Sequence, residues 1–177
     1  MGKEALLALV NNAALLITFV VLYTVFYVKS TTSRQIPRQI ISGFLLGMVT
    51  VGVMLNSWQL SPGVVFDTRS VALGLIGLFF GFIPSMISAS MAVGLRILMG
   101  GEGTIPGIST ILSSVSVGLI WQHHKRRDSC DRSLLELYLF GIVVHVFMLL
   151  CMLLLPSQSR ETFFEIAALP VMIVYPA

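Results

Sequence analysis

The chain has 177 residues, of which 56% are hydrophobic and 11% are charged. Soluble domains carry about 25% charged residues, so this chain has too few ionic side chains to cover a water-facing surface. Its formal charge of +3 is small, and its basic residues lie between apolar segments, which excludes a nucleic-acid-binding surface and is typical of topology signals. We therefore expect a multi-pass protein of the cell inner (plasma) membrane whose first partner is the lipid bilayer.

Six apolar segments follow one another along the chain and are separated by short polar breaks. They cover residues 5–28, 40–56, 70–95, 107–122, 134–155 and 162–177. The first segment is too long for a signal peptide and ends in basic residues, so we predict a spanning helix. The last segment stops while it is still apolar, after about 25 Å of helix, which is shorter than a bilayer's hydrocarbon core. We therefore expect residues 1–177 to form one transmembrane domain that is cut off within its last helix.

The third segment contains no charged residue between Arg69 and Arg96 and is interrupted by Gly81-Phe82-Ile83-Pro84. A continuous apolar run of this length predicts a single spanning helix. A proline close to a glycine at its centre predicts two shorter helices joined by a bend. Small residues would let such a hairpin pack closely, and the segment supplies Gly74, Gly77, Gly81, Ser85, Ala89 and Gly94.

Loop charges favour the hairpin. Cytoplasmic loops are rich in lysine and arginine, and the two richest breaks here are 29–38 and 123–133. Both are cytoplasmic only if segment 70–95 enters and leaves the membrane on the same face. The fold predicted on this basis is an all-α, polytopic membrane helical bundle with five full crossings, a proline-broken re-entrant hairpin and an outside N-terminus. Six plain crossings, with 70–95 as one straight helix, are the alternative.

The order of these features resembles a known family. The stretch FDTRSVALGLIGLFFG (66–81) is followed by GLRILMGGEG (94–103), a further apolar helix and the basic cluster 123–127. This arrangement is similar to the membrane module of LytS/YhcK-type five-transmembrane receptors. The resemblance implies a sensor of small ligands or cell-wall-related signals, followed by a cytoplasmic histidine kinase or diguanylate cyclase domain. On that basis we expect a homodimer formed through the output domain.

Arg69 and Arg96 are the first candidates for ligand binding. Arginine at membrane depth costs on the order of 2.5–3.5 kcal/mol on insertion scales, so it usually faces a cavity or a partner. Its planar guanidinium holds carboxylates with two parallel hydrogen bonds, so a converging pair would suit a small anion. Two other interpretations remain open: a structural ion pair between Arg96 and Asp67, and arginines that reach the headgroups from helix ends.

Further candidates follow the second arginine. Gly100 and Gly101 would let backbone approach a ligand, although they are also typical of a tight turn. We predict the next helix to open at Pro106-Gly107, where its N-terminus would favour an anion. Thr110 and Ser113 are candidate hydroxyl contacts, but hydroxyls in such helices often bond their own backbone. The predicted ligand-binding set is Arg69, Arg96, Asp67, Gly100, Gly101, Gly107, Thr110 and Ser113.

These observations favour a membrane sensor domain that binds a small, carboxylate-type ligand and shifts the packing of the last helix. We find no residue pattern with catalytic or metal-ligand spacing, so we expect no cofactor, no metal and no enzymatic activity of this part of the protein. Two alternatives stay open: a substrate-binding membrane component of a small-molecule transporter, and a structural membrane subunit.

Overall fold

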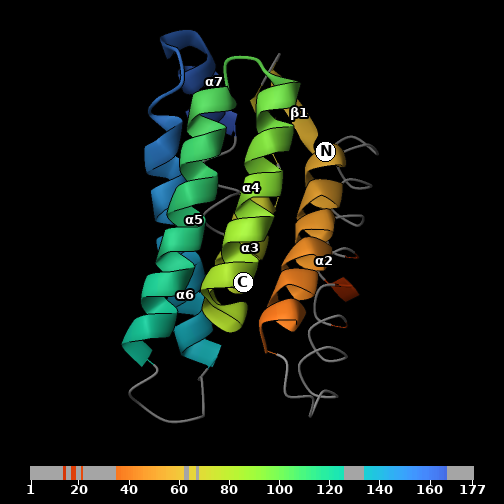
Figure 1. Ribbon diagram of the computed structural model, residues 1–177. Coiled ribbons are helices and arrows are strands. Elements are labelled where there is room, and N and C mark those ends of the chain that lie inside the picture. Colours follow the sequence, from red (N-terminus) through yellow and green to blue (C-terminus); the bar gives the residue numbers. More distant parts are fainter. Residues whose placement is uncertain are drawn as a thin grey trace.

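The computed structural model describes residues 35–61, 64–66, 68–125 and 134–166, together with residues 14, 17, 18 and 21. These residues form helices and one small antiparallel sheet (Figure 1): α2 (Gln35–Leu55), β1 (Trp58–Ser61), β2 (Val64–Phe66), α3 (Arg69–Phe80), α4 (Phe82–Met99), α5 (Thr104–Lys125), α6 (Leu134–Met152) and α7 (Ser157–Ile166). Helices α2, α4, α5 and α6 are long and apolar enough to cross a membrane. The molecule is a polytopic helical bundle, as predicted. Most of segment 5–28 and residues 167–177 lie outside the described residues.

Helices α3 and α4 form the predicted hairpin, which bends at Gly81. Gly81 has φ 82°, in the left-handed region that favours glycine. Pro84 has no N–H to donate to the carbonyl of Phe80, so a continuous helix would lose a hydrogen bond and kink at this point. Instead, the backbone N–H and the hydroxyl of Ser85 donate to the Gly81 carbonyl oxygen, at 3.3 and 2.6 Å. The break therefore results from the backbone properties of Gly81 and Pro84.

The hairpin returns the chain to the end of the bundle where it began. Arg69 opens α3 and Arg96 lies in the last turn of α4, and both side chains reach the same glycine at the start of α5. The alternative of six plain crossings is therefore wrong, because one straight helix over 70–95 would place the arginines at opposite ends. The second arm is longer than predicted, since Phe82–Met99 is long enough to cross a membrane by itself.

The basic ends of the helices lie together at the other end of the bundle. Helix α2 begins, and α5 ends, at the lower end in Figure 1, so Arg38 and the histidines 123 and 124 share that end. The loop-charge argument requires both basic loops at one end of the bundle. They lie at one end because α3 and α4 run in opposite directions and together add two passes. That the lower end is cytoplasmic and the arginine end lies outside stays a prediction from loop charge.

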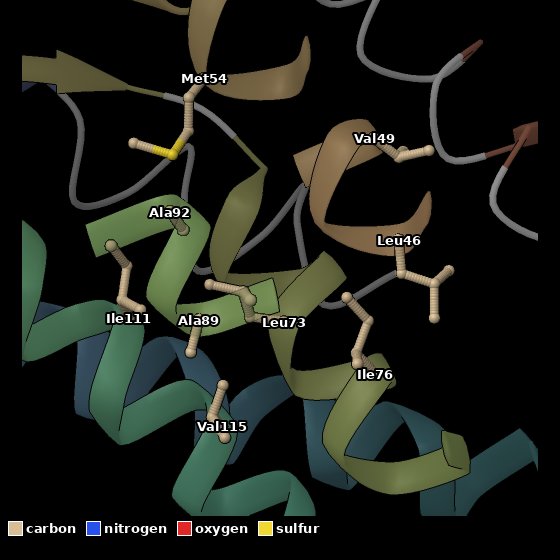
Figure 2. Close-up of a cluster of buried hydrophobic side chains, with 9 residues drawn as sticks. All are labelled: Leu46, Val49, Met54, Leu73, Ile76, Ala89, Ala92, Ile111 and Val115. Carbon is tan, nitrogen blue, oxygen red and sulfur yellow. The ribbon is translucent and has the colours of Figure 1, made fainter. Parts of the chain in front are cut away.

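Helix α3 has only 12 residues and lies among the longer helices. It contacts α2, α4, α5 and α6. Figure 2 shows its Leu73 and Ile76 among apolar side chains from the neighbouring helices. The buried cluster consists of Leu46, Val49, Met54, Leu73, Ile76, Ala89, Ala92, Ile111 and Val115. Because α3 is buried on most sides, the position of Arg69 at its first residue is fixed by the whole bundle.

Glycines bring the helices into close contact at two crossings. At the α3–α5 crossing, a Cβ on Gly118 would overlap the carbonyl oxygen of Gly74 and lie 3.0 Å from the Cα of Gly77. At the α2–α4 crossing, the Ser88 hydroxyl donates to the Gly43 carbonyl oxygen at 2.9 Å. Close backbone approach of this kind holds helices together in lipid, where apolar burial between helices contributes little.

The predicted small-residue set was therefore right for some members and wrong for Gly94. A Cβ on Gly74 would lie 3.1 Å from the Phe140 ring, and one on Gly77 would meet backbone of α5 at 3.0 Å. Nothing lies within 4 Å of a Cβ on Gly94, so this glycine does not mediate close packing.

Two stretches that we predicted as plain polar breaks contain regular structure. Within 56–69, β1 and β2 pair antiparallel, with Trp58 opposite Phe66 and an irregularity between Gln59 and Ser61. Within 156–161, helix α7 begins at Ser157. Similarly, α5 begins at Thr104, two residues before the predicted start. These elements complete the arginine end of the bundle.

Candidate ligand site at the arginine pair

Arg69 and Arg96 converge on Gly107. A Cβ built on Gly107 would lie 2.7 Å from Nε of Arg96 and 3.2 Å from Nη2 of Arg69. The two guanidinium groups thus occupy the space beside a residue that has no side chain. The three residues come from the start of α3, the end of α4 and the first turn of α5, which the hairpin brings to one end of the bundle.

Both arginines are buried. Arg69 is 5% exposed and Arg96 is 1% exposed, which makes Arg96 one of the largest fully buried side chains among the described residues. Guanidinium stays protonated in proteins, so two positive charges lie inside the protein at this end of the bundle. Buried charges require hydrogen bonds or charged partners. The position of the pair within the bundle excludes the interpretation that both arginines only reach the headgroups from helix ends.

Arg96 is held by the loop that follows it. Its Nε donates to the Gly103 carbonyl oxygen at 3.1 Å, and the same carbonyl accepts the backbone N–H of Gly107 at 2.9 Å. The first bond ties the guanidinium to the loop, and the second ties the same carbonyl to the first turn of α5. A shift of the guanidinium would therefore be transmitted directly to the loop.

Gly100 and Gly101 make the turn between α4 and α5. Their φ angles are 63° and 85°, in the region that favours glycine. The N–H of Gly100 donates to the Arg96 carbonyl oxygen at 3.2 Å and closes α4. The Gly101 carbonyl accepts both the N–H and the hydroxyl of Thr104, at 3.1 and 2.8 Å. The turn accounts for both glycines, and a contact between their backbone and a ligand stays a prediction.

The two predicted hydroxyl contacts bond within their own helix. The Thr110 hydroxyl is buried and donates to the Pro106 carbonyl oxygen at 2.8 Å. The Ser113 hydroxyl donates to the Thr110 carbonyl oxygen at 3.1 Å and lies 3.7 Å from the Cys151 sulfur. A hydroxyl that donates to a carbonyl keeps acceptor capacity only, so neither is preset to donate to an anion. Asp67 and its predicted ion pair lie outside the described residues.

The comparisons with known proteins agree with this architecture. The sequence model of one family, described as the 5TMR of 5TMR-LYT, matches residues 9–177. The chain belongs to this family. It is a LytS/YhcK-type five-transmembrane receptor domain, and 5TMR-LYT domains are sensory domains of membrane proteins. No curated protein and no solved structure matched the chain.

Sequence reasoning missed two hydroxyls of this 5TMR-LYT domain. Thr68 and Ser114 are 6% and 0% exposed, and their hydroxyl oxygens have no hydrogen-bond partner among the described residues. Thr68 directly precedes Arg69, and Ser114 lies two helical turns beyond Gly107 on α5. A buried hydroxyl without a partner costs about 1–3 kcal/mol. The sequence shows only that both are hydroxyl residues near the arginines, because their burial depends on how α3 packs against α5.

Proposed function

We propose that this 5TMR-LYT domain binds a small carboxylate at the arginine pair, from the outer side of the membrane, and relays binding to a cytoplasmic histidine kinase or diguanylate cyclase domain. One observation carries the proposal: two buried guanidinium groups lie beside Gly107, which leaves room for them because it has no side chain. Paired guanidinium groups match the two oxygens of a carboxylate, and a hydrogen bond to a charged group contributes about 1.5–3 kcal/mol.

Position supports a small ligand that enters from outside. The pair lies at the end of the bundle opposite Arg38 and the basic end of α5, which the charge rule assigns to the cytoplasm. The first turn of α5 adds the positive end of a helix dipole beside the arginines. The buried hydroxyl of Thr68, the residue before Arg69, can donate to a further ligand oxygen.

Relay requires the ligand to favour one helix arrangement over another. A carboxylate that draws the arginines together would change how the start of α3, the end of α4 and the start of α5 fit against each other. These three ends meet at the arginine pair, so binding there would shift all three helices at once. The movement would reach the output domain through the C-terminal segment.

A thermal-shift screen of the purified chain tests the proposal. We expect formate, acetate, propionate or succinate to raise the melting temperature above that in sodium chloride of equal ionic strength. At about 100 times the dissociation constant, the gain is about 2.7 kcal/mol, or roughly 5–10 °C for a chain of this size. Equal melting temperatures in chloride and in all four carboxylates would contradict carboxylate binding. Uptake of a binding carboxylate into sealed vesicles would instead favour transport.

A further inference from the structure

Helix α7 lies against the end of the bundle that holds the arginine pair. In Figure 1 it is at the upper end, where α4 ends and α5 begins. Its Phe163 is 1% exposed and packs in a cluster with Met148, Met152 and Leu155. This cluster anchors α7 to the end of α6. Helix α7 is also the last element that the structure describes before the C-terminal residues 167–177.

One line of contacts joins α7 to Arg96. The hydroxyl of Ser159, on α7, donates to Oε2 of Glu102 at 2.6 Å, although the two residues are 57 positions apart. Glu102 is followed by Gly103, whose carbonyl oxygen accepts the Arg96 Nε–H at 3.1 Å. A movement of the Arg96 guanidinium therefore displaces the loop that carries Glu102. The short bond to a carboxylate passes that displacement to α7.

A second line of contacts joins α7 to Arg69. The hydroxyl of Ser70, the residue after Arg69, donates to the Met148 sulfur at 3.9 Å. Met148 belongs to the cluster that holds Phe163. This line passes through buried apolar packing on α6, whereas the first passes through an exposed loop. The two lines share no residue, and both run from the arginine pair to α7.

We propose that the position of α7 is coupled to the arginine pair through the Glu102–Ser159 hydrogen bond, which we call the latch. This inference rests on the proposed function, because it assigns the route by which occupancy of that site leaves the membrane domain. Energetic coupling between two places is reciprocal. A change at the latch must therefore alter the arginine end of the bundle as much as a change at the arginines alters α7.

Hydrogen–deuterium exchange of the full chain in lipid nanodiscs tests the latch without any ligand. Exchange reports local opening of each segment. We expect Ser159→Ala to raise exchange of the α7 amides about tenfold, because it removes a hydrogen bond to a charged group. Glu102→Gln keeps an acceptor oxygen but removes its charge, so we expect a smaller rise in the same amides. By reciprocity, both should also raise exchange at residues 103–107. Glu161→Gln, an exposed charge change on the same helix, is the matched control and should do neither.

Arg96→Lys completes the test. It should raise exchange in α7 when Ser159 is present and add nothing further in the Ser159→Ala background. Equal, additive effects in both backgrounds would overturn the latch, and so would unchanged exchange at 103–107 in Ser159→Ala. If Arg96→Lys raises exchange in α2 as strongly as in α7, the variant has loosened the whole bundle. The Glu102→Gln variant then tests the latch in its place, and unchanged exchange in α7 and at 103–107 in that variant would overturn it. Because no carboxylate is used, a failed carboxylate screen and a failed latch are separate results.

Discussion

Gly118→Ala should strongly destabilise the bundle, by roughly 1–3 kcal/mol or more. The added methyl group would overlap the carbonyl oxygen of Gly74 and lie 3.0 Å from the Cα of Gly77 and from the N of Leu78. All three atoms are backbone, so no side chain can rotate away and α3 must separate from α5. Thermal unfolding of the purified chain in detergent measures the effect as a lower melting temperature.

Gly94→Ala is the matched control for this prediction. Gly94 lies within α4, has no atom within 4 Å of its would-be Cβ, and is not among the glycines with positive φ. Alanine there should be neutral or stabilising by about 0.5–1 kcal/mol, because it favours the helix. Equal melting temperatures for the two variants would contradict the close α3–α5 crossing that positions Arg69.

Arg69→Lys and Arg96→Lys should each weaken carboxylate binding about 10- to 100-fold while the charge is kept. Lysine provides a point charge without the planar fork, so one of two parallel hydrogen bonds is lost, and each such bond to a charged group contributes about 1.5–3 kcal/mol. Titration calorimetry with the carboxylate that gives the largest thermal shift measures the two affinities. Wild-type affinity in both variants would contradict two-oxygen binding by the pair.

Two further variants sharpen this result. Arg38→Lys makes the same chemical change at the opposite end of the bundle and should leave carboxylate affinity unchanged. The Arg69→Lys/Arg96→Lys double variant should lose less than the two single losses combined, because residues that bind one group act as a unit. Fully additive losses would indicate two independent roles for the arginines.

The hairpin could be predicted from the sequence because it depends on two helix-breaking residues and on loop charges. Neither depends on how side chains pack in the folded bundle. Gly81 and Pro84 break the helix by their own backbone chemistry. The basic loops at 29–38 and 123–133 lie on one side only if the number of passes between them is even. Together these two arguments place Arg69 and Arg96 at one end, and the structure confirms that placement.

Details of packing could not be predicted in the same way. A glycine within an apolar helix has the same local sequence character whether it meets backbone, as Gly118 does, or nothing, as Gly94 does. The burial of the Thr68 and Ser114 hydroxyls depends on which faces of α3 and α5 meet. The β-hairpin is a different case, because Pro62-Gly63 between two runs rich in apolar residues is a turn signal that we did not use.

The contact of Arg96 with Gly103 joins residues that are close in the sequence, but it forms only when the loop between α4 and α5 is folded. Its bond to the Gly103 carbonyl arises because Gly100 and Gly101 turn the chain back over the end of α4. The sequence indicated a glycine-rich turn there, and the arginine beside it. Nothing in the local pattern indicated that Glu102 would meet Ser159, since the position of α7 depends on the cluster around Phe163.

Sided labelling of single cysteines tests the central claim most directly, namely that the stretch between the arginines returns to the face from which it started. In a background with Cys130 and Cys151 replaced by serine, Asn56→Cys, Glu102→Cys and His124→Cys each place one thiol at an exposed position. A membrane-impermeant maleimide on intact cells should label positions 56 and 102, and should label position 124 only after permeabilisation. Labelling of 56 and 102 from opposite sides of the membrane would contradict the hairpin and, with it, the shared arginine site.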